Sequence, residues 1–452
     1  MSGEKPREIA VEVLGRRGAR EFTEDLLEQA LGQAQLNSAD RGLCQELVYG
    51  VTRWQATLDF LIGRKTGERK QRAALQDLLR LGLYQIFWLE RIPNHAAVNV
   101  TVELAKRRGF GPQAGFINAV LRGYLREFEA TRELLNDLKN NQPALGYSHP
   151  EWLVRRWQER WGPENTAKLL AWNNTPPPTF ARINTLKIAA EKLLPIWRDE
   201  NVEYDFVGRD WFADNLVFEL KSHPPLRRLS SFQQGFFYIQ DPSTLLAVHE
   251  LDPKPGEKVL DLCAAPGGKL TYIAQLMANQ GQLVAHDTSP ERLQLIEQNC
   301  ARLGALIVRN AECGVRNAAQ PAIPNSSANP HSSPVPHSAL GTPHLFDRVL
   351  VDAPCSNTGV MRRRIDLRWR ISPAEMDRLK KTQLELLHQA AGLVRPGGTL
   401  VYSTCSLEPE ENRQVINRLL AENPWLTLES ERELAPCNDA TDGAYVARLR
   451  RA

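Results

Sequence analysis

The sequence predicts an α/β protein whose C-terminal half is built on a doubly wound parallel sheet. From about residue 241, short apolar runs alternate with amphipathic helical stretches, which is typical of strand–helix–strand units. Before that, residues 1–145 show only helical periodicity, and residues 146–240 mix helix and strand signals. We therefore expect a helical domain at 1–145, a small α+β subdomain at 146–240 and an α/β domain at 241–452.

The composition is that of an ordinary globular protein, with 452 residues, 42% hydrophobic and 24% charged. No apolar run is long enough for a transmembrane helix, and the charged N-terminus lacks the apolar stretch of a signal peptide. Seven scattered cysteines without a Cys-x-x-Cys pair argue against a disulfide framework and against zinc. We expect a cytoplasmic protein without a membrane segment or a metal, and a monomer.

In the helical domain, Leu75, Leu78, Leu79, Leu83 and Ile86 recur at helical spacing. The run 37–40 has helix-capping residues, and Pro93 is placed to open another helix. No catalytic group of residues is evident in this domain.

The small subdomain begins with a Trp-rich helix after residue 147, which a run of prolines at 176–178 ends. We then expect strands at 179–184, 202–206 and 216–220 and a helix at 189–197. Such a mixture is consistent with a ferredoxin-like arrangement, which can carry RNA contacts.

In the α/β domain we expect strands and helices in alternation. The strands are expected at 259–263, 283–286, 305–309, 348–352 and 399–403, and the helices at 269–277, 290–303 and 373–392. Residues 318–343 contain six Pro and five Ser with almost no charge, which predicts a disordered insertion. Three histidines lie at 331, 337 and 344, and their presence is explained better by chance composition than by a metal site.

A glycine turn follows the first of these strands, in the stretch 261–269 (Asp-Leu-Cys-Ala-Ala-Pro-Gly-Gly-Lys). Gly267 and Gly268 allow a ligand to approach the backbone closely. The turn matches neither the Gly-x-Gly-x-x-Gly fingerprint nor a Walker loop. Asp287 ends the next strand, where a carboxylate holds a ribose diol in dinucleotide-binding sheets. The alternative is a tight turn and an acid that caps a helix.

Two further strands end in thiols. The strand at 348–352 delivers Asp352 and then Cys355, and the strand at 399–403 leads to Cys405. Ligands of such sheets lie beyond the carboxyl ends of the strands, where all of these groups fall. Two thiols, an acid and a nucleoside-binding turn fit methylation at C5 of a cytosine, because a thiolate that adds to C6 makes C5 nucleophilic. The target base would have to leave its stack.

A cluster of arginines begins shortly after Cys355 and consists of Arg362, Arg363, Arg364 and Arg368. Most charge clusters are solvated faces, but this one is placed where it could hold the phosphates of a polyanion beside a reactive group. We expect it to bind RNA.

Together these motifs resemble the RNA cytosine-5 methyltransferases of the NOL1/NOP2/Sun family. The resemblance rests on 261–269, on Asp352–Gly359, on 365–369, on Thr404–Ser406 and on 409–412. Three stretches of the helical domain, at 40–53, 94–99 and 116–122, are similar to the NusB-type RNA-binding domain fused to bacterial small-subunit rRNA enzymes of this family. The resemblance covers nearly the whole chain except 318–343.

The resemblance implies a Rossmann-like methyltransferase domain, S-adenosylmethionine as cofactor and 16S rRNA as partner. It implies that Cys405 is the nucleophile, that Cys355 assists release of the product and that Asp352 contacts the base at N3. Asp287 would hold the ribose and Glu312 the adenine side, where the family usually has Asp. The implied cofactor-binding residues are Cys263, Ala264, Ala265, Pro266, Gly267, Gly268, Lys269, Asp287, Glu312 and Asp352.

Two other functions stay open at this level. One is a cytosine-5 methyltransferase of tRNA or 23S rRNA, since recognition is not evident in the sequence. The other is a non-catalytic RNA-binding assembly factor, although such a protein has no need of two thiols at a ligand edge. A DNA enzyme is less expected, because DNA cytosine-5 enzymes use the Pro-Cys thiol, and the thiol of Thr-Cys-Ser would have no role.

Overall fold

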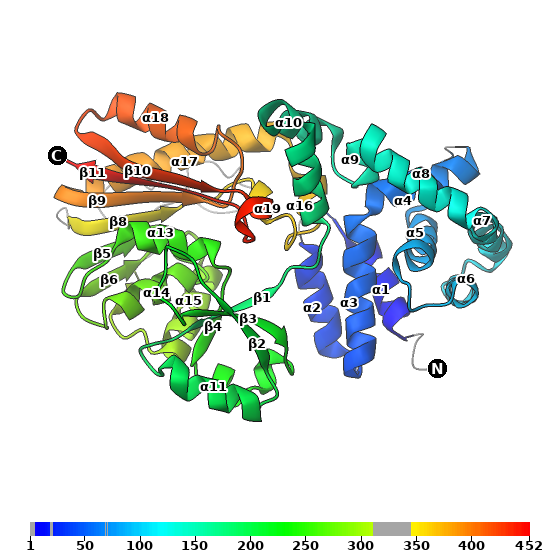
Figure 1. Ribbon diagram of the computed structural model, residues 1–452, viewed down its shortest axis with the longest axis horizontal. Helices are drawn as coiled ribbons and strands as arrows, with labels where there is room; N and C mark the ends of the chain where they lie inside the picture. The colour runs from blue at the N-terminus through cyan, green and yellow to red at the C-terminus, as the bar shows by residue number, and fades with distance from the viewer. Residues whose placement is uncertain (1–4, 19–20, 68, 70, 311–344) are drawn as a thin grey trace, which may run out of the picture. The chain divides into compact units, whose positions relative to one another are not determined.

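The computed structural model describes residues 5–18, 21–67, 69, 71–310 and 345–452 (Figure 1). The described chain divides into two compact units. One is helical and consists of Met1–Pro176 with Val360–Ile371, and the other consists of Pro177–Gly359 with Ser372–Ala452. The predicted insertion at 318–343 and Glu312 both lie outside the described residues.

The helical unit is built around apolar stripes that face one another, and its core includes Leu47, Leu78 and Leu121. Asn37 begins a helix by accepting a hydrogen bond from the Asp40 amide at 2.8 Å, and Pro93 directly precedes another, as predicted. The helices are α1 (Lys5–Arg16), α2 (Thr23–Gln33), α3 (Ser38–Arg53), α4 (Gln55–Thr66), α5 (Ala73–Trp88), α6 (Asn94–Arg107), α7 (Ala114–Arg126), α8 (Phe128–Asn141), α9 (Pro143–Gly146) and α10 (Glu151–Asn173).

A short segment that lies far along the chain, Val360–Ile371, folds with this unit and contains helix α16 (Leu367–Arg370). The Arg368 side chain is fully buried in the unit. Its guanidinium donates hydrogen bonds to the carbonyl oxygens of Ser148 and Asn173 at 3.2 and 3.1 Å and to Oδ1 of Asn174 at 2.8 Å. A buried charge needs such partners, so this arginine is a structural element of the helical unit.

The small subdomain holds a four-stranded antiparallel sheet with the order β2-β3-β1-β4. Its strands and two helices follow one another as βαββαβ, which is the ferredoxin-like arrangement that the sequence predicts. Trp197 is fully buried against Phe218 and Phe237 and centres the core. The elements are β1 (Thr179–Ile183), α11 (Ala190–Asp199), β2 (Glu203–Val207), β3 (Val217–Ser222), α12 (Ser230–Gln233) and β4 (Phe237–Ile239).

The largest sheet has seven strands in the order β10-β11-β9-β8-β5-β6-β7. The strands are β5 (Lys258–Asp261), β6 (Gln282–Ala285), β7 (Val308–Asn310), β8 (Phe346–Asp352), β9 (Val394–Thr404), β10 (Leu426–Leu434) and β11 (Ala444–Arg451). The five from β9 to β7 are parallel, as predicted, whereas β11 and β10 add an antiparallel edge. The predicted strands are thus the parallel ones, and the antiparallel edge is an addition in which β11 returns from β10 without a crossover helix.

Helices cover both faces of this sheet (Figure 1). The apolar cluster that contains Leu246, Ile273 and Ile296 lies on one face, and the cluster that contains Leu387 and Ile416 lies on the other. The first face is covered by α13 (Ser243–Leu251), α14 (Gly268–Leu276) and α15 (Pro290–Leu303), and the second by α17 (Pro373–Leu393) and α18 (Arg413–Glu422). This is the doubly wound architecture, in which sites form at the carboxyl ends of the strands.

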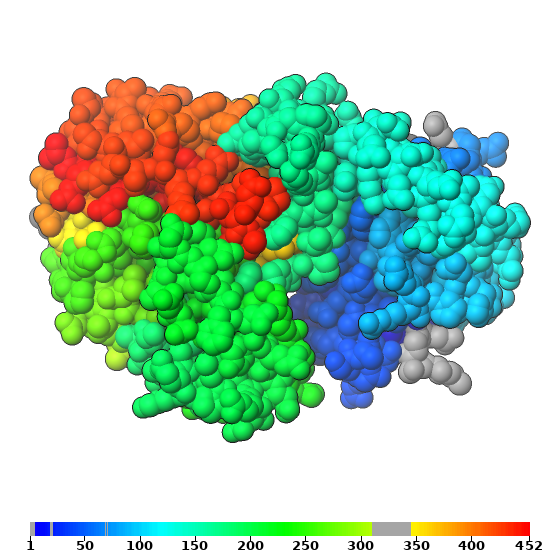
Figure 2. Space-filling view, viewed as in Figure 1, coloured from blue at the N-terminus to red at the C-terminus, as the bar shows by residue number. Residues whose placement is uncertain are grey.

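In Figure 2 the green atoms of the four-stranded subdomain are continuous with the green and yellow-green atoms of the seven-stranded domain. Buried hydrogen bonds join the two: Asn184 donates to the carbonyl oxygen of Leu303 at 2.7 Å, and Arg182 donates to Oγ1 of Thr271 at 3.1 Å. The subdomain is thus fixed on the larger sheet. No helix within the described ranges is long and apolar enough to cross a membrane.

Candidate active site

The glycine turn joins β5 to α14, at the carboxyl edge of the sheet. Gly267 has φ +101°, a conformation that side chains rarely adopt. At Gly268 a Cβ would lie 3.0 Å from the Tyr238 ring, so the close packing behind the turn favours glycine there too. The turn therefore presents bare backbone to whatever lies in front of it.

Three side chains hold this turn from behind and from the side. Arg182 is fully buried and donates to the Gly268 carbonyl oxygen at 3.0 Å. Asn299 donates to the Pro266 carbonyl oxygen at 2.9 Å. Asp287, which follows β6, accepts a hydrogen bond from the Ala265 amide at 3.2 Å. The sequence prediction that Asp287 and the turn belong to one site is consistent with this contact, although the ligand role of Asp287 stays a prediction.

Asp261 is the last residue of β5 and is 1% exposed. One of its carboxylate oxygens, Oδ1, is buried and has no hydrogen-bond partner among the described residues. Burial, helped by the nearby Asp352, raises the pKa of Asp261 to about 7. An acceptor without a partner beside a bare glycine turn fits a ligand that brings a hydrogen-bond donor or a positive charge.

The two thiols lie side by side at the same edge. Sγ of Cys355 is 3.4 Å from Sγ of Cys405, and Cys405 in turn donates to Oδ1 of Asn357 at 2.9 Å. Cys355 is 7% exposed, whereas Cys405 is half-buried. The hydrogen bond with Cys405 and burial together raise the pKa of Cys355 well above its ordinary value. Of the two, Cys405 is the one that a substrate can reach more easily.

Asp352 ends β8 and is paired in register with Ser403 of β9. Its Oδ1 accepts a hydrogen bond from the Ser403 hydroxyl at 2.7 Å, and its Oδ2 accepts one from Lys269 Nζ at 2.6 Å. Burial lowers the pKa of Lys269, but Asp352 outweighs burial and the net pKa is raised. Lys269 thus stays charged and ties the glycine turn to the carboxylate beside the thiols.

A second carboxylate, Glu411, fixes the loops that carry the two thiols. It is fully buried and accepts hydrogen bonds from the Ser356 amide at 2.8 Å, from the Ser406 hydroxyl at 2.5 Å and from Gln383 Nε2 at 3.0 Å. The Ser356 hydroxyl also donates to it. Because Ser356 follows Cys355 and Ser406 follows Cys405, one carboxylate sets the spacing of both thiols.

The structure brings together most of the predicted groups: Asp352, Cys355 and Cys405 form one cluster, with Lys269 on Asp352. Sequence reasoning included Asn357, Ser403 and Glu411 within its motifs but gave them no role. A polar residue directly beside each thiol or acid was the available signal. Glu312 lies outside the described residues, so its predicted contact with the cofactor stays a prediction.

The arginine cluster requires a correction. Arg362 is 4% exposed and stacks on the Trp172 ring at 4.1 Å, and Arg368 is wholly enclosed in the helical unit. Neither presents its guanidinium to a phosphate in this structure, so their predicted role in binding RNA was wrong. They are buried because the segment 360–371 packs into the helical core. Arg363 is half-buried and Arg364 is exposed, and a role in RNA binding stays a prediction for these two.

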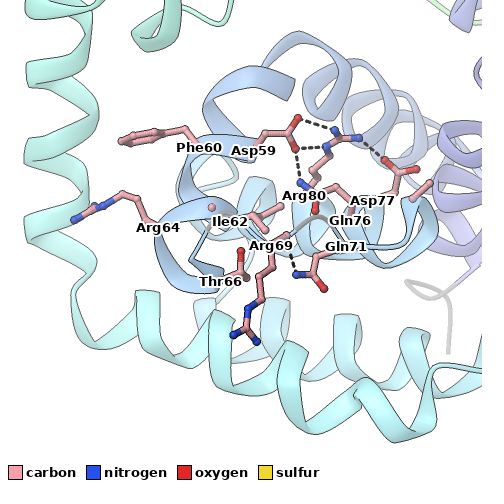
Figure 3. Close-up of a pocket in the computed structure, with 12 residues that line it drawn as sticks. Asp59, Phe60, Ile62, Arg64, Thr66, Arg69, Gln71, Gln76, Asp77 and Arg80 are labelled. Carbon is pink, nitrogen blue, oxygen red and sulfur yellow. Dashed lines mark hydrogen bonds and ion pairs between the residues drawn. The ribbon is translucent and has the colours of Figure 1, made fainter.

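The helical unit contains a hollow of about 640 Å³ (Figure 3). Its most prominent polar feature is Arg80, which donates to both oxygens of Asp59 at 2.7 Å and to Asp77 at 2.8 Å. The opposite charges satisfy one another, and Gln76 completes the group by donating to Asp59 at 2.6 Å. The cluster therefore stabilises the helices and is not a catalytic group. Within the described residues no set of His, Cys, Asp and Glu side chains is grouped as a metal site.

A doubly wound sheet with a glycine turn after β5, an acid after β6 and reactive side chains after β8 and β9 defines the class of Rossmann-like methyltransferases. Comparison with known proteins identifies the family within this class. Family models match three stretches: the NusB family at 4–126, a ferredoxin-like domain of RsmF/B-like methyltransferases at 149–209, and the 16S rRNA methyltransferase RsmB/F family at 248–450.

Two curated relatives match over most of their length. The chain is 36% identical to a probable ribosomal RNA small subunit methyltransferase B of Bacillus subtilis, over 92% of this chain and 88% of the relative. It is 34% identical to the Synechocystis protein of the same name, over 99% of both. A crystal structure of a methyltransferase homolog from Pyrococcus horikoshii is 29% identical and has a TM-score of 0.54, covering 68% of this chain and 97% of that one.

The chain therefore belongs to the 16S rRNA methyltransferase RsmB/F family. This confirms the resemblance found in the sequence, including its NusB and ferredoxin-like parts. The chain is an rRNA methyltransferase by family.

Proposed function

We propose that this protein transfers a methyl group from S-adenosylmethionine to C5 of a cytosine in 16S rRNA, through a covalent bond between Cys405 and the base. The observation that carries the proposal is the placement of two thiols 3.4 Å apart beside the paired Asp352 and Lys269. A methyltransferase that attacked an oxygen or an amino nitrogen would need no thiol, whereas C5 of cytosine must first be activated.

In the proposed reaction, the Cys405 thiolate adds to C6 of the base, and Asp352 passes to N3 a proton that its partner Lys269 supplies. The electron pair then resides at C5, which takes the methyl group that S-adenosylmethionine supplies. The C5 proton is removed, the bond between Sγ and C6 breaks, and the proton at N3 returns to the enzyme. We assign removal of the C5 proton to Cys355, whose Sγ lies 3.4 Å from Sγ of Cys405. Because its pKa is raised, Cys355 must first release its own proton to solvent, and the resulting thiolate then takes the C5 proton.

Three features fit the cofactor. The bare backbone of the turn at Gly267 and Gly268 accepts a close ligand. The buried Oδ1 of Asp261 has no partner and suits the positively charged methionine end. Asp287 follows β6, where a ribose diol is held in sheets of this kind. The adenine side is assigned to Glu312 on the resemblance alone.

We further propose that the helical unit, Arg363 and the exposed Arg364 contact the rRNA. We also propose that the protein acts as a monomer without a metal and that it is cytoplasmic, where rRNA is made. We keep 1–145, 146–240 and 241–452 as the boundaries of three modules. Substrates such as tRNA or 23S rRNA are alternatives within the same chemistry.

The test is a gel assay for covalent adducts between protein and RNA, with 16S rRNA and S-adenosylmethionine. We expect an SDS-resistant adduct with Cys355→Ala, in which release is blocked, and none with Cys405→Ala. The reverse pattern would exchange the roles of the two thiols. If neither variant forms an adduct and the wild type transfers no methyl group to 16S, 23S or transfer RNA, the protein is a binding factor and the proposal is wrong.

A further inference from the structure

A second hollow lies behind the glycine turn, between the four-stranded subdomain and α15. Its volume is about 430 Å³, within the range of sites that hold a small ligand or a single nucleotide. All of it belongs to the unit that carries the thiols. The lining residues, none of which is acidic, are Arg227, Phe232, Tyr238, Ile239, Gln298, Asn299 and Arg302.

One wall of the hollow is a fixed stack of a guanidinium on aromatic rings. The guanidinium of Arg302 lies 4.4 Å from the centre of the Phe232 ring and 5.8 Å from that of Tyr238. It is held in place because Nη1 donates to the carbonyl oxygens of Phe232 and Phe237 at 3.0 and 3.2 Å. Planar arginine and aromatic groups are the surfaces on which unpaired bases stack.

Two amide side chains and a second arginine complete the lining. Gln298 and Asn299 carry both donors and acceptors, the combination that contacts base edges. Arg227 is exposed at this hollow and adds a positive charge suited to a phosphate. A flat cationic surface, amides and a positive charge are the three contacts that one nucleotide of single-stranded RNA needs.

Two residues that line the hollow also contact the glycine turn. Asn299 lines it and donates to the Pro266 carbonyl oxygen at 2.9 Å. Tyr238 lines it as well, and its ring packs behind Gly268. A nucleotide in the hollow would therefore contact the same residues that hold the turn at Pro266 and Gly268.

We propose that this hollow binds one unpaired nucleotide of the rRNA substrate near the target cytosine, and so contributes to substrate recognition. The proposal rests on the proposed function, because it takes rRNA as the ligand. It assigns a role to the ferredoxin-like subdomain, which supplies Phe232 and Tyr238, and to α15, which supplies Gln298 and Asn299.

The test compares Arg227→Ala combined with Gln298→Ala against Arg228→Ala, an exposed neighbour that does not line the hollow. We expect the double variant to raise the KM for 16S rRNA about 10-fold, with kcat and the affinity for S-adenosylmethionine unchanged. Arg228→Ala should stay within about 2-fold of wild type. A double variant that matches Arg228→Ala in KM would overturn the proposal.

Crosslinking gives a readout that does not depend on activity. With 16S rRNA that carries 4-thiouridine, we expect crosslinks in the peptide that holds Phe232 and Tyr238, weakened by Arg302→Lys, which keeps the charge but loses the planar surface. Absence of crosslinks there in wild type would contradict the assignment. If wild-type protein transfers no methyl group to 16S rRNA, the proposed function itself fails. If it is active but the hollow variants behave as the control, only the hollow is wrongly assigned.

Discussion

Replacing Glu411 with alanine should impair both stability and catalysis, because this carboxylate connects the two thiol loops. Four donors converge on it: the amide and the hydroxyl of Ser356, the hydroxyl of Ser406 and Nε2 of Gln383. The two hydroxyls lie 3.0 Å apart and can bond to one another, and Gln383 keeps a bond to the Pro354 carbonyl oxygen at 2.9 Å. The Ser356 amide is the donor that is left without a partner.

An unpaired buried amide costs about 1–3 kcal/mol, and the weakened bonds of the other three donors add to this. We therefore expect Glu411→Ala to lower the free energy of unfolding by about 2–4 kcal/mol, measured by denaturant titration. Under conditions where the variant is fully folded, kcat should fall about 100-fold. A nucleophile that is misplaced by about an ångström reduces the rate by this order.

Glu411→Gln is the matched control for shape. Its amide nitrogen would face hydrogen-bond donors, so we expect an intermediate loss of stability and of kcat, with unchanged KM for RNA and unchanged affinity for S-adenosylmethionine. A Glu411→Ala protein that unfolds like wild type, or that loses stability but keeps full kcat, would refute the idea that this carboxylate positions the thiols.

Further predictions concern the other buried charges and the thiols. Because the pKa of Asp261 is raised to about 7, the folded state binds a proton that the unfolded state has lost between about pH 4 and pH 7. As pH rises through this window, wild type should thus lose stability relative to Asp261→Asn by up to about 1.4 kcal/mol per pH unit, measured by denaturant titration. Unfolding free energies of the two proteins that change in parallel with pH would contradict this. Replacing the buried Arg368 by alanine should lower the unfolding free energy by about 3–5 kcal/mol. The logarithm of the RNA-binding constant, plotted against the logarithm of salt concentration, should keep the wild-type slope. A shallower slope would show that Arg368 contacts a phosphate after all. Treatment with diamide should join Cys355 to Cys405 and abolish methyl transfer until dithiothreitol is added, and peptide mapping that finds both thiols free after inactivation would exclude this route.

The carboxyl ends of the parallel strands could be predicted from the sequence because the signals there are local. Each of β5, β8 and β9 is a short apolar run followed directly by its polar residue, so Asp352 and Cys405 fall at one edge once the strands are parallel. The 3.4 Å approach of the thiols was not predictable in this way. It depends on Glu411, which follows Cys405 in the same loop but is bonded by tertiary packing to Ser356 and Gln383.

The antiparallel edge and the buried arginines show where local patterns fail. β10 has charged residues along much of its length, including Glu429 and Arg432, so its apolar signal is weak and its place is fixed by pairing with β11. The run from Arg362 to Arg364 has the same composition as a solvated basic patch. The burial of Arg362 itself and of its neighbours Met361 and Ile365 shows that the segment enters a core.

The buried segment has a further consequence for how the enzyme is built. The chain leaves the seven-stranded unit after Gly359, contributes 360–371 to the helical unit and returns at Ser372. This excursion starts at Val360, shortly after Cys355, and Arg368 within it donates to the carbonyl oxygens of Ser148 and Asn173. Without the helical unit these bonds and the apolar burial of the segment would be lost, and the loop of the thiol would continue into an unanchored chain. The helical unit therefore anchors the segment 360–371 that follows the Cys355 loop along the chain.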